Sequence, residues 1–192
     1  MDEKIKKMLS NPTLLVIDLQ NVYSKGQKWE CKNFDEVIKN IKLLLSNLKN
    51  NKVVFTRFKA NQKPKGVWEN YNMQNADVNS DKWLNNIADG VKQFSEKYPC
   101  YDKSVYSAYS IKSIREIAAE SSCVVITGAV AECCVLSTVM SFIDAGVYVV
   151  YLKDAIASID DKVKSATLNV LDGFAPLQIN IMDTKEISDF MS

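Results

Sequence analysis

Residues 123–135, CVVITGAVAECCV, pass from a short apolar run through small residues to two adjacent cysteines. The first five residues, CVVIT, are typical of a buried strand. A helix is expected to begin near Cys133 and to end at Gly146, because a glycine just beyond the last apolar residue commonly caps a helix. A strand that turns directly into a helix indicates a chain built from βαβ units.

Other short runs of apolar and β-branched residues predict more buried strands. They lie at residues 13–18 (TLLVID), 53–58 (VVFTRF), 147–152 (VYVVYL) and 177–182 (LQINIM), with a weaker signal at 98–106 (YPCYDKSVY). Apolar residues at helical spacing lie between these runs. They predict helices at 37–48 (Val37 to Leu48), at 111–118 behind an N-cap at Ser110, and from about Asp161 to a left-handed glycine cap at Gly173.

Strands that alternate with helices pair in parallel through right-handed crossovers. The sequence therefore predicts an α/β fold, a doubly wound open sheet with helices on both faces. At 192 residues, one domain spanning 1–192 is expected.

Composition excludes several classes of function. Lys and Arg number 24 and Asp and Glu 23, so no basic excess is available for nucleic-acid binding. No run approaches the roughly 18 apolar residues of a membrane span, and the first residues lack the apolar core of a signal peptide. Five cysteines without a C-x-x-C pair suit reduced thiols, so we expect a cytoplasmic protein without membrane association.

The absence of histidine is the most restrictive feature of the composition. It excludes Ser–His and Cys–His catalytic pairs and every imidazole metal ligand. Any general base must be Asp, Glu, Lys or Tyr.

Ligands of doubly wound sheets bind outside the carboxyl ends of the strands, so candidate residues were sought there. Asp18 follows a buried strand and could be a catalytic carboxylate or the cap of a turn. Lys103 lies between aromatic residues, either solvated or buried beside a carboxylate. Cys133 or Cys134, but not both, could point into the same site. The start of a helix favours the thiolate form of a cysteine placed there. Most cysteines, however, are small buried hydrophobic residues, so either one could be structural.

Residues 59–82 form a long polar connection that holds Pro64, Gly66, Trp68 and Tyr71 without a clear period. Connections of that length inside a compact domain are usually functional loops.

Several motifs resemble the isochorismatase-like cysteine hydrolases, which include nicotinamidases, N-carbamoylsarcosine amidases and maleamate amidohydrolases. The matching stretches are LLVIDLQN (14–21), VVFTRF (53–58), YDKSVYSAY (101–109), ITGAVAECCVLSTV (126–139) and the segment from Gly146 to Ala155. They follow the family's order and spacing over nearly the whole chain.

The resemblance implies a six-stranded parallel sheet of order 3-2-1-4-5-6 and a catalytic triad of Asp18, Lys103 and Cys134. Cys134 is preferred to Cys133 because the family's nucleophile directly precedes a valine. A cis peptide bond between Val130 and Ala131 is implied too, with the backbone amides of Ala131 and Cys134 forming an oxyanion hole. The implied reaction cleaves the C–N amide bond of a small molecule through a thioester, in a homo-oligomer such as a dimer or tetramer.

Two departures from the family pattern concern the metal and the substrate. Metal-binding relatives hold histidines after the second strand, whereas TRFKANQKPKG (56–66) has none, so neither a metal nor another cofactor is expected. Where the family usually reads T-D-x-C, this chain reads Ala131, Glu132, Cys133, Cys134, so a hydroxyl beside the nucleophile is missing.

Five side chains are expected to contact the substrate at the pocket mouth: Gln20, Trp68, Tyr71, Tyr106 and Tyr109. Aromatic walls suit a flat or apolar acyl group, which favours small planar amides that are neutral or weakly anionic. The rings could instead be core or interface anchors. Two other functions remain open: vinyl-ether hydrolysis of the isochorismatase type, and a catalytically silent binding module of the same fold.

Overall fold

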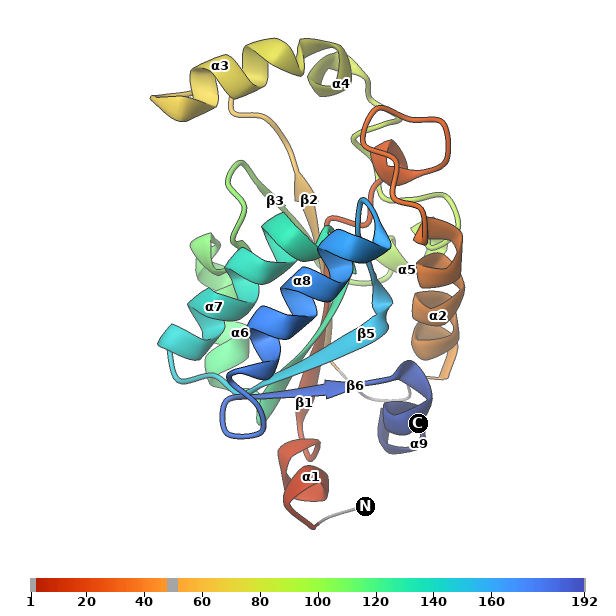
Figure 1. Ribbon diagram of the computed structural model, residues 1–192, viewed down its shortest axis with the longest axis vertical. Coiled ribbons are helices and arrows are strands. Elements are labelled where there is room, and N and C mark those ends of the chain that lie inside the picture. Colours follow the sequence, from red (N-terminus) through yellow and green to blue (C-terminus); the bar gives the residue numbers. More distant parts are fainter. Residues whose placement is uncertain (1–2, 48–51, 192) are drawn as a thin grey trace.

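The computed structural model describes residues 3–47 and 52–191, which build one parallel sheet of order β3-β2-β1-β4-β5-β6 (Figure 1). The strands are β1 (Pro12–Ile17), β2 (Lys52–Phe58), β3 (Cys100–Lys103), β4 (Cys123–Ala129), β5 (Val149–Ala157) and β6 (Ile179–Met182). This order confirms the expected fold class. The four-residue strand β3 lies at one edge and pairs with β2 alone.

Helices cover both faces of the sheet (Figure 1). One face packs against α2 (Phe34–Asn47) and α9 (Thr184–Met191), and the other against α6 (Lys112–Ala119), α7 (Leu136–Asp144) and α8 (Asp161–Asp172). Two more short helices are α1 (Glu3–Met8) and α5 (Lys92–Ser95). No helix in the described ranges has the length and apolar character needed to cross a membrane.

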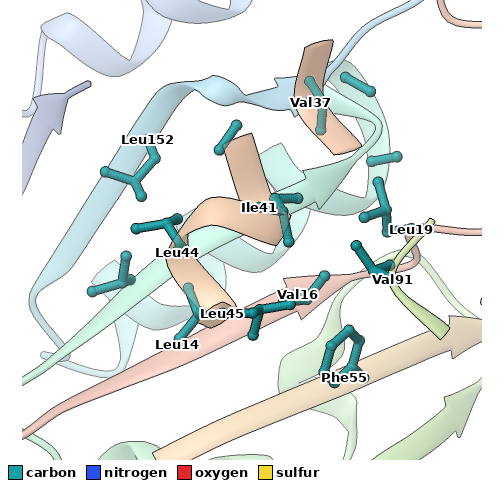
Figure 2. Close-up of a cluster of buried hydrophobic side chains, with 14 of the residues drawn as sticks. Leu14, Val16, Leu19, Val37, Ile41, Leu44, Leu45, Phe55, Val91 and Leu152 are labelled. Carbon is teal, nitrogen blue, oxygen red and sulfur yellow. The ribbon is translucent and has the colours of Figure 1, made fainter. Parts of the chain in front are cut away.

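The central strand β1 is buried along its whole length because it faces helices on both sides. Leu14 and Val16 join the core beneath α2, whereas Leu15 and Ile17 point into the opposite core. Figure 2 shows Leu14 and Val16 packed with Ile41, Leu44 and Leu45 of α2. The apolar run TLLVI is continuous because helices cover both faces of the sheet, so alternate side chains enter two different cores.

At Gly128, strands β4 and β1 come unusually close together. Gly128 pairs with Ile17 and has a φ of 111°, a left-handed conformation that glycine adopts without steric cost. A Cβ atom here would collide with the Ile17 backbone. The two strand ends that precede Asp18 and Cys134 are therefore held at a spacing that requires a glycine.

Two details of the expected helices differ from the structure. The helix expected behind Ser110 begins at Lys112 with Ile111 as its N-cap, because Ser110 belongs to the 3₁₀ turn η2 (Ala108–Ser110). Gly146 is left-handed at a φ of 76°, as expected, but Gly173 has a φ of −62° and ends α8 without a left-handed turn. Leu48 lies outside the described residues.

The long connection at 59–82 contains two short helices, α3 (Val67–Gln74) and α4 (Ala76–Ser80). In Figure 1 they stand beyond the carboxyl ends of the strands, away from the helices that cover the sheet. No residue of α3 is fully buried, so its sequence has no apolar stripe to reveal it.

Candidate active site

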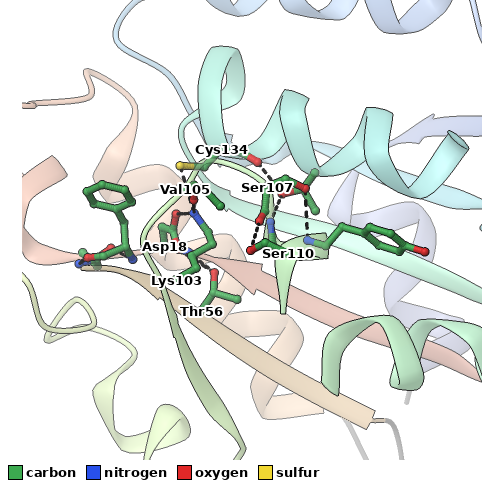
Figure 3. Close-up of polar contacts among 12 residues, drawn as sticks. Asp18, Thr56, Lys103, Val105, Ser107, Ser110 and Cys134 are labelled. Atoms are coloured by element: carbon green, nitrogen blue, oxygen red, sulfur yellow. Dashed lines mark hydrogen bonds and ion pairs between the residues drawn. The ribbon is translucent and has the colours of Figure 1, made fainter. Parts of the chain in front are cut away.

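Three strand ends bring Asp18, Lys103 and Cys134 together (Figure 3). Asp18 follows β1, Lys103 ends β3, and Cys134 lies in the π-helical turn η3 (Ala131–Val135) directly after β4. The Lys103 Nζ is 2.5 Å from the Asp18 Oδ2 and donates a hydrogen bond of 3.4 Å to the Cys134 Sγ. A lysine ammonium therefore bridges a carboxylate and a thiol.

Asp18 is completely buried and its orientation is fixed by strand β2. The Thr56 hydroxyl donates a hydrogen bond of 2.7 Å to the Asp18 Oδ1, and the Asp18 N–H donates one of 3.1 Å to the Thr56 carbonyl. Its φ of 43° is left-handed, a region that aspartate tolerates better than most residues. Asp18 is thus a buried carboxylate fixed by Thr56 rather than an exposed turn cap.

Lys103 is buried among compensating groups, which excludes the solvated alternative. Its Nζ also donates to the Val105 carbonyl at 3.0 Å and lies 5.6 Å from the centre of the Phe58 ring. Burial lowers the pKa of Lys103, but the Asp18 and Cys134 charges outweigh that effect and raise it. Lys103 is therefore a permanent cation at neutral pH.

Cys134 is the buried member of the cysteine pair and the one that contacts Lys103. Burial, followed by the negative charge of Asp18, raises the pKa of its thiol well above the ordinary value, although Lys103 acts in the opposite direction. In the free protein, burial and Asp18 therefore favour the neutral thiol, whereas a helix start alone would favour the thiolate. The thiol keeps its proton and needs a base.

A threonine links Cys134 to the segment that follows Lys103. The Thr138 hydroxyl donates to the Cys134 carbonyl at 2.6 Å and accepts from the Ala108 N–H at 2.9 Å. Both bonds are buried, so they fix the turn that carries Cys134 relative to the segment that follows Lys103.

The cis peptide bond lies one position earlier than expected. It joins Ala129 to Val130, not Val130 to Ala131, because the chain leaves β4 at Ala129 and Ala131 already begins the helical turn. Ala131 and Cys134 remain in the first turn of a helical segment, where N–H groups are available to an anion.

A pocket of about 240 Å³ opens beside Cys134. Aromatic rings form much of its wall: Tyr23, Trp29, Phe58, Tyr71 and Tyr106. The remaining wall is Lys28, Cys31, Val130, Glu132, Cys133 and Ile159. Larger hollows exist elsewhere on the surface, but none of their lining residues belongs to the Asp18–Lys103–Cys134 group.

A family model described as the isochorismatase domain matches residues 12–186. The chain belongs to the isochorismatase family. This confirms the resemblance carried by the motifs and makes the protein a member of a hydrolase family.

Solved structures agree with this assignment at the level of the fold. A cysteine hydrolase from Pseudomonas syringae pv. phaseolicola 1448A superposes with a TM-score of 0.81 at 15% identity, over 96% of this chain and 93% of that one. N-carbamoylsarcosine amidase from Thermoplasma acidophilum gives 0.70 at 17% identity, with coverage of 92% and 98%. Nicotinamidase from Bacillus subtilis gives 0.71 at 14%, with coverage of 90% and 99%. No curated protein matches the chain.

The aromatic residues expected at the mouth of the isochorismatase-family pocket lie in three different settings. Tyr71 and Tyr106 line the pocket. Trp68 packs behind them, with its ring centre 5.3 Å from that of Tyr71 and 5.0 Å from that of Tyr106. Tyr109 packs edge-on against Phe142 at 5.6 Å and does not line the pocket, so its contact with substrate stays a prediction that this packing does not support.

Gln20 does not line the pocket either, so its expected contact with substrate stays a prediction that the pocket lining does not support. It is buried, and its amide nitrogen donates to the carbonyls of Phe58 at 3.1 Å and Asn85 at 2.8 Å. Its amide oxygen accepts the Phe58 N–H at 2.8 Å. Gln20 therefore holds the end of β2 and a distant loop to β1.

Lys28, Trp29 and Glu132 line the pocket but were not selected from the sequence. Lys28 and Trp29 belong to a polar loop after β1 and connect to α3 and α4: Lys28 pairs with Asp77 at 2.8 Å, and the Trp29 Nε1 donates to the Asn75 Oδ1 at 3.3 Å. Glu132 stands two residues before the nucleophile, a position that could have drawn attention.

The end of β2 and the residue that follows it carry two cations, Arg57 and Lys59. Arg57 and Lys59 both pair with Asp102 at 2.8 Å. Across residues 3–47 and 52–191, no group of three or more Cys, Asp or Glu side chains is placed to hold a metal ion.

Proposed function

We propose that this protein is a cysteine hydrolase that cleaves the C–N amide bond of a small molecule through a thioester. The observation that carries the proposal is the buried contact of one ammonium, Lys103, with both the Asp18 carboxylate and the Cys134 thiol beside a pocket. Carboxylate, cation and thiol supply the base, the charge balance and the nucleophile of acyl transfer.

In the first half-reaction, the Cys134 Sγ attacks the amide carbonyl while Asp18 accepts the thiol proton. The raised pKa of Cys134 makes this transfer necessary, and the Lys103 ammonium contacts both the carboxylate and the thiol. Lys103 keeps both partners in place and balances the negative charge as it moves from oxygen to sulphur.

The tetrahedral intermediate carries its negative charge on the former carbonyl oxygen. Backbone N–H groups of Ala131 and Cys134, in the first turn after β4, are suited to stabilise this oxyanion. Protonated Asp18 then donates its proton to the departing amine, so the C–N bond breaks and a thioester remains.

In the second half-reaction, Asp18 takes a proton from water, and the hydroxide attacks the thioester. The C–S bond breaks, the carboxylic acid leaves, and the proton returns to the Cys134 sulphur. Ammonia or an amine and a carboxylic acid are the products.

A screen of small amides and ureido compounds for ammonia release tests the proposal. A substrate should release ammonia in stoichiometric amounts with its acid, and hydroxylamine should divert the acyl group to a hydroxamate. Cleavage of a vinyl ether without acylation of Cys134 would favour the vinyl-ether hydrolase instead. Binding of these compounds without turnover of any of them would favour the catalytically silent binding module.

A further inference from the structure

Two charged side chains line the pocket beside Cys134, the cation Lys28 and the anion Glu132. Lys103 is paired with Asp18, and Lys28 is paired with Asp77 at 2.8 Å and also donates to the Gln74 carbonyl. Glu132, by contrast, has no cation within ion-pair distance among the described residues. Its partners are the Ser158 hydroxyl at 3.0 Å and the Ile159 N–H at 3.4 Å, which are neutral donors.

The Glu132 charge reaches the groups that line the pocket. Burial and then the Glu132 charge raise the pKa of Cys31 to about 12, and the same two causes raise that of Cys133. Both thiols are therefore neutral at physiological pH, so they add no negative charge of their own to that of Glu132.

Much of the pocket wall consists of aromatic rings packed against one another. The Trp29 ring centre lies 6.0 Å from that of Tyr23 and 6.4 Å from that of Tyr71, which in turn meets Phe58 edge-on at 6.3 Å. The negative faces of such rings attract ammonium groups, most strongly when several rings share a site from which water is excluded.

We propose that the substrate carries a positively charged group, such as a quaternary ammonium, held between the Glu132 carboxylate and this aromatic wall. The inference rests on the proposed function in taking the pocket beside Cys134 as the substrate site. It replaces the expectation of a neutral or weakly anionic amide, which considered the rings without the carboxylate.

Size and position narrow the ligand further. At about 240 Å³ the pocket is below the roughly 300–1,000 Å³ typical of drug-sized ligands, so a small molecule is required. Glu132 and Cys134 both line this pocket, so a cation bound by the Glu132 carboxylate would belong to the same small molecule as the carbonyl that Cys134 attacks. The inferred substrate class is therefore a small amide of an ammonio acid.

Two amides of nearly equal shape test this proposal. Trimethylammonio-acetamide carries a cation where tert-butylacetamide carries a neutral carbon. Binding is measured by calorimetry on the full-length Cys134→Ala variant, in which neither compound is consumed. The cationic amide should bind at least about tenfold more tightly, as expected for a carboxylate and rings acting on one ammonium.

The Glu132→Gln substitution, added to Cys134→Ala, should remove most of that preference because it keeps an amide oxygen for hydrogen bonding but loses the charge. Glu69→Gln is the matched control, because Glu69 is exposed on α3 and does not line the pocket. It should leave the preference unchanged. Thermal melting identifies a variant that has lost its fold.

The proposal is overturned if Cys134→Ala binds the two amides equally or binds neither. It is also overturned if the folded Glu132→Gln variant keeps the full preference. Because the first comparison needs no substitution at Glu132, an unfolded variant would not remove the test. Turnover is assayed separately with the wild type: tight cation binding without ammonia release would refute the proposed function and leave the cation site standing.

Discussion

Replacing Asp18 with asparagine should make Cys134 more reactive toward iodoacetamide while abolishing hydrolysis. The negative charge of Asp18 raises the pKa of the thiol, and Lys103 lowers it. Once the carboxylate is gone, the thiolate becomes the natural counter-ion of the buried ammonium. A base for substrate turnover is lost, yet a better nucleophile for alkylation is gained.

The geometry sets the size of this effect. Lys103 Nζ lies 2.5 Å from the carboxylate and 3.4 Å from the sulphur, so the two anions can be no more than about 6 Å apart. At an effective dielectric constant of about 20, unit charges at that separation repel by about 3 kcal/mol. This corresponds to about two pKa units, or roughly a hundredfold more thiolate at any pH below the pKa of Cys134.

The assay follows alkylation by mass spectrometry between about pH 6 and pH 9 in a Cys133→Ala background. Subtracting the labelling of Cys134→Ala isolates the nucleophile from the other thiols. In the wild type, labelling should rise with pH through this range, because burial and Asp18 keep the thiol protonated. In Asp18→Asn, the rise of Cys134 labelling should occur at lower pH than in the wild type. Slower alkylation than in the wild type at every pH would refute this account of the charges.

Three further predictions follow from the described contacts. Cys134→Ala should abolish ammonia release with an unchanged circular dichroism spectrum, whereas Cys133→Ala, which lacks the contact with Lys103, should lower kcat/KM only slightly; the reverse result would mean that Cys133 is the nucleophile. Exhaustive chelation with EDTA should leave activity intact, since the described residues place no metal-binding group of side chains, and recovery of lost activity with zinc would contradict this. Gln20→Ala should lower the free energy of unfolding in urea by about 2–4 kcal/mol, because it deprives the Phe58 N–H and two buried or half-buried carbonyls of their partner; a loss below about 0.5 kcal/mol would show that other contacts hold the loop.

The central strands β1, β2, β4 and β5 could be predicted because they are short, largely apolar and buried, whereas β3 (CYDK) gives a weaker signal and the strand order came from the family resemblance. The meeting of Asp18, Lys103 and one cysteine could also be predicted, since all three follow strands whose carboxyl ends share one edge. Helix α3 could not, because it buries none of its residues and has no periodic stripe.

Gln20 and Tyr109 do not line the pocket because both contact residues that are distant in sequence. Gln20 resembles a free polar side chain until residues 38 and 65 positions away occupy its amide. Tyr109 turns toward the core because Phe142 offers it a partner there. Glu132 is of interest because it has no cationic partner among the described residues. Only the folded chain reveals this, since its hydrogen-bond donors, Ser158 and Ile159, are neutral.

Strand β3 has a consequence for the way in which the protein would lose its activity. It supplies the ammonium of the triad, yet it is four residues long and hydrogen-bonds to a neighbour on one side only. Short edge strands open locally at a lower free energy than the interior of a sheet. As the urea concentration or the temperature rises, detachment of β3 would separate Lys103 from Asp18 while the central strands stay paired. Activity should therefore be lost before the circular dichroism signal changes.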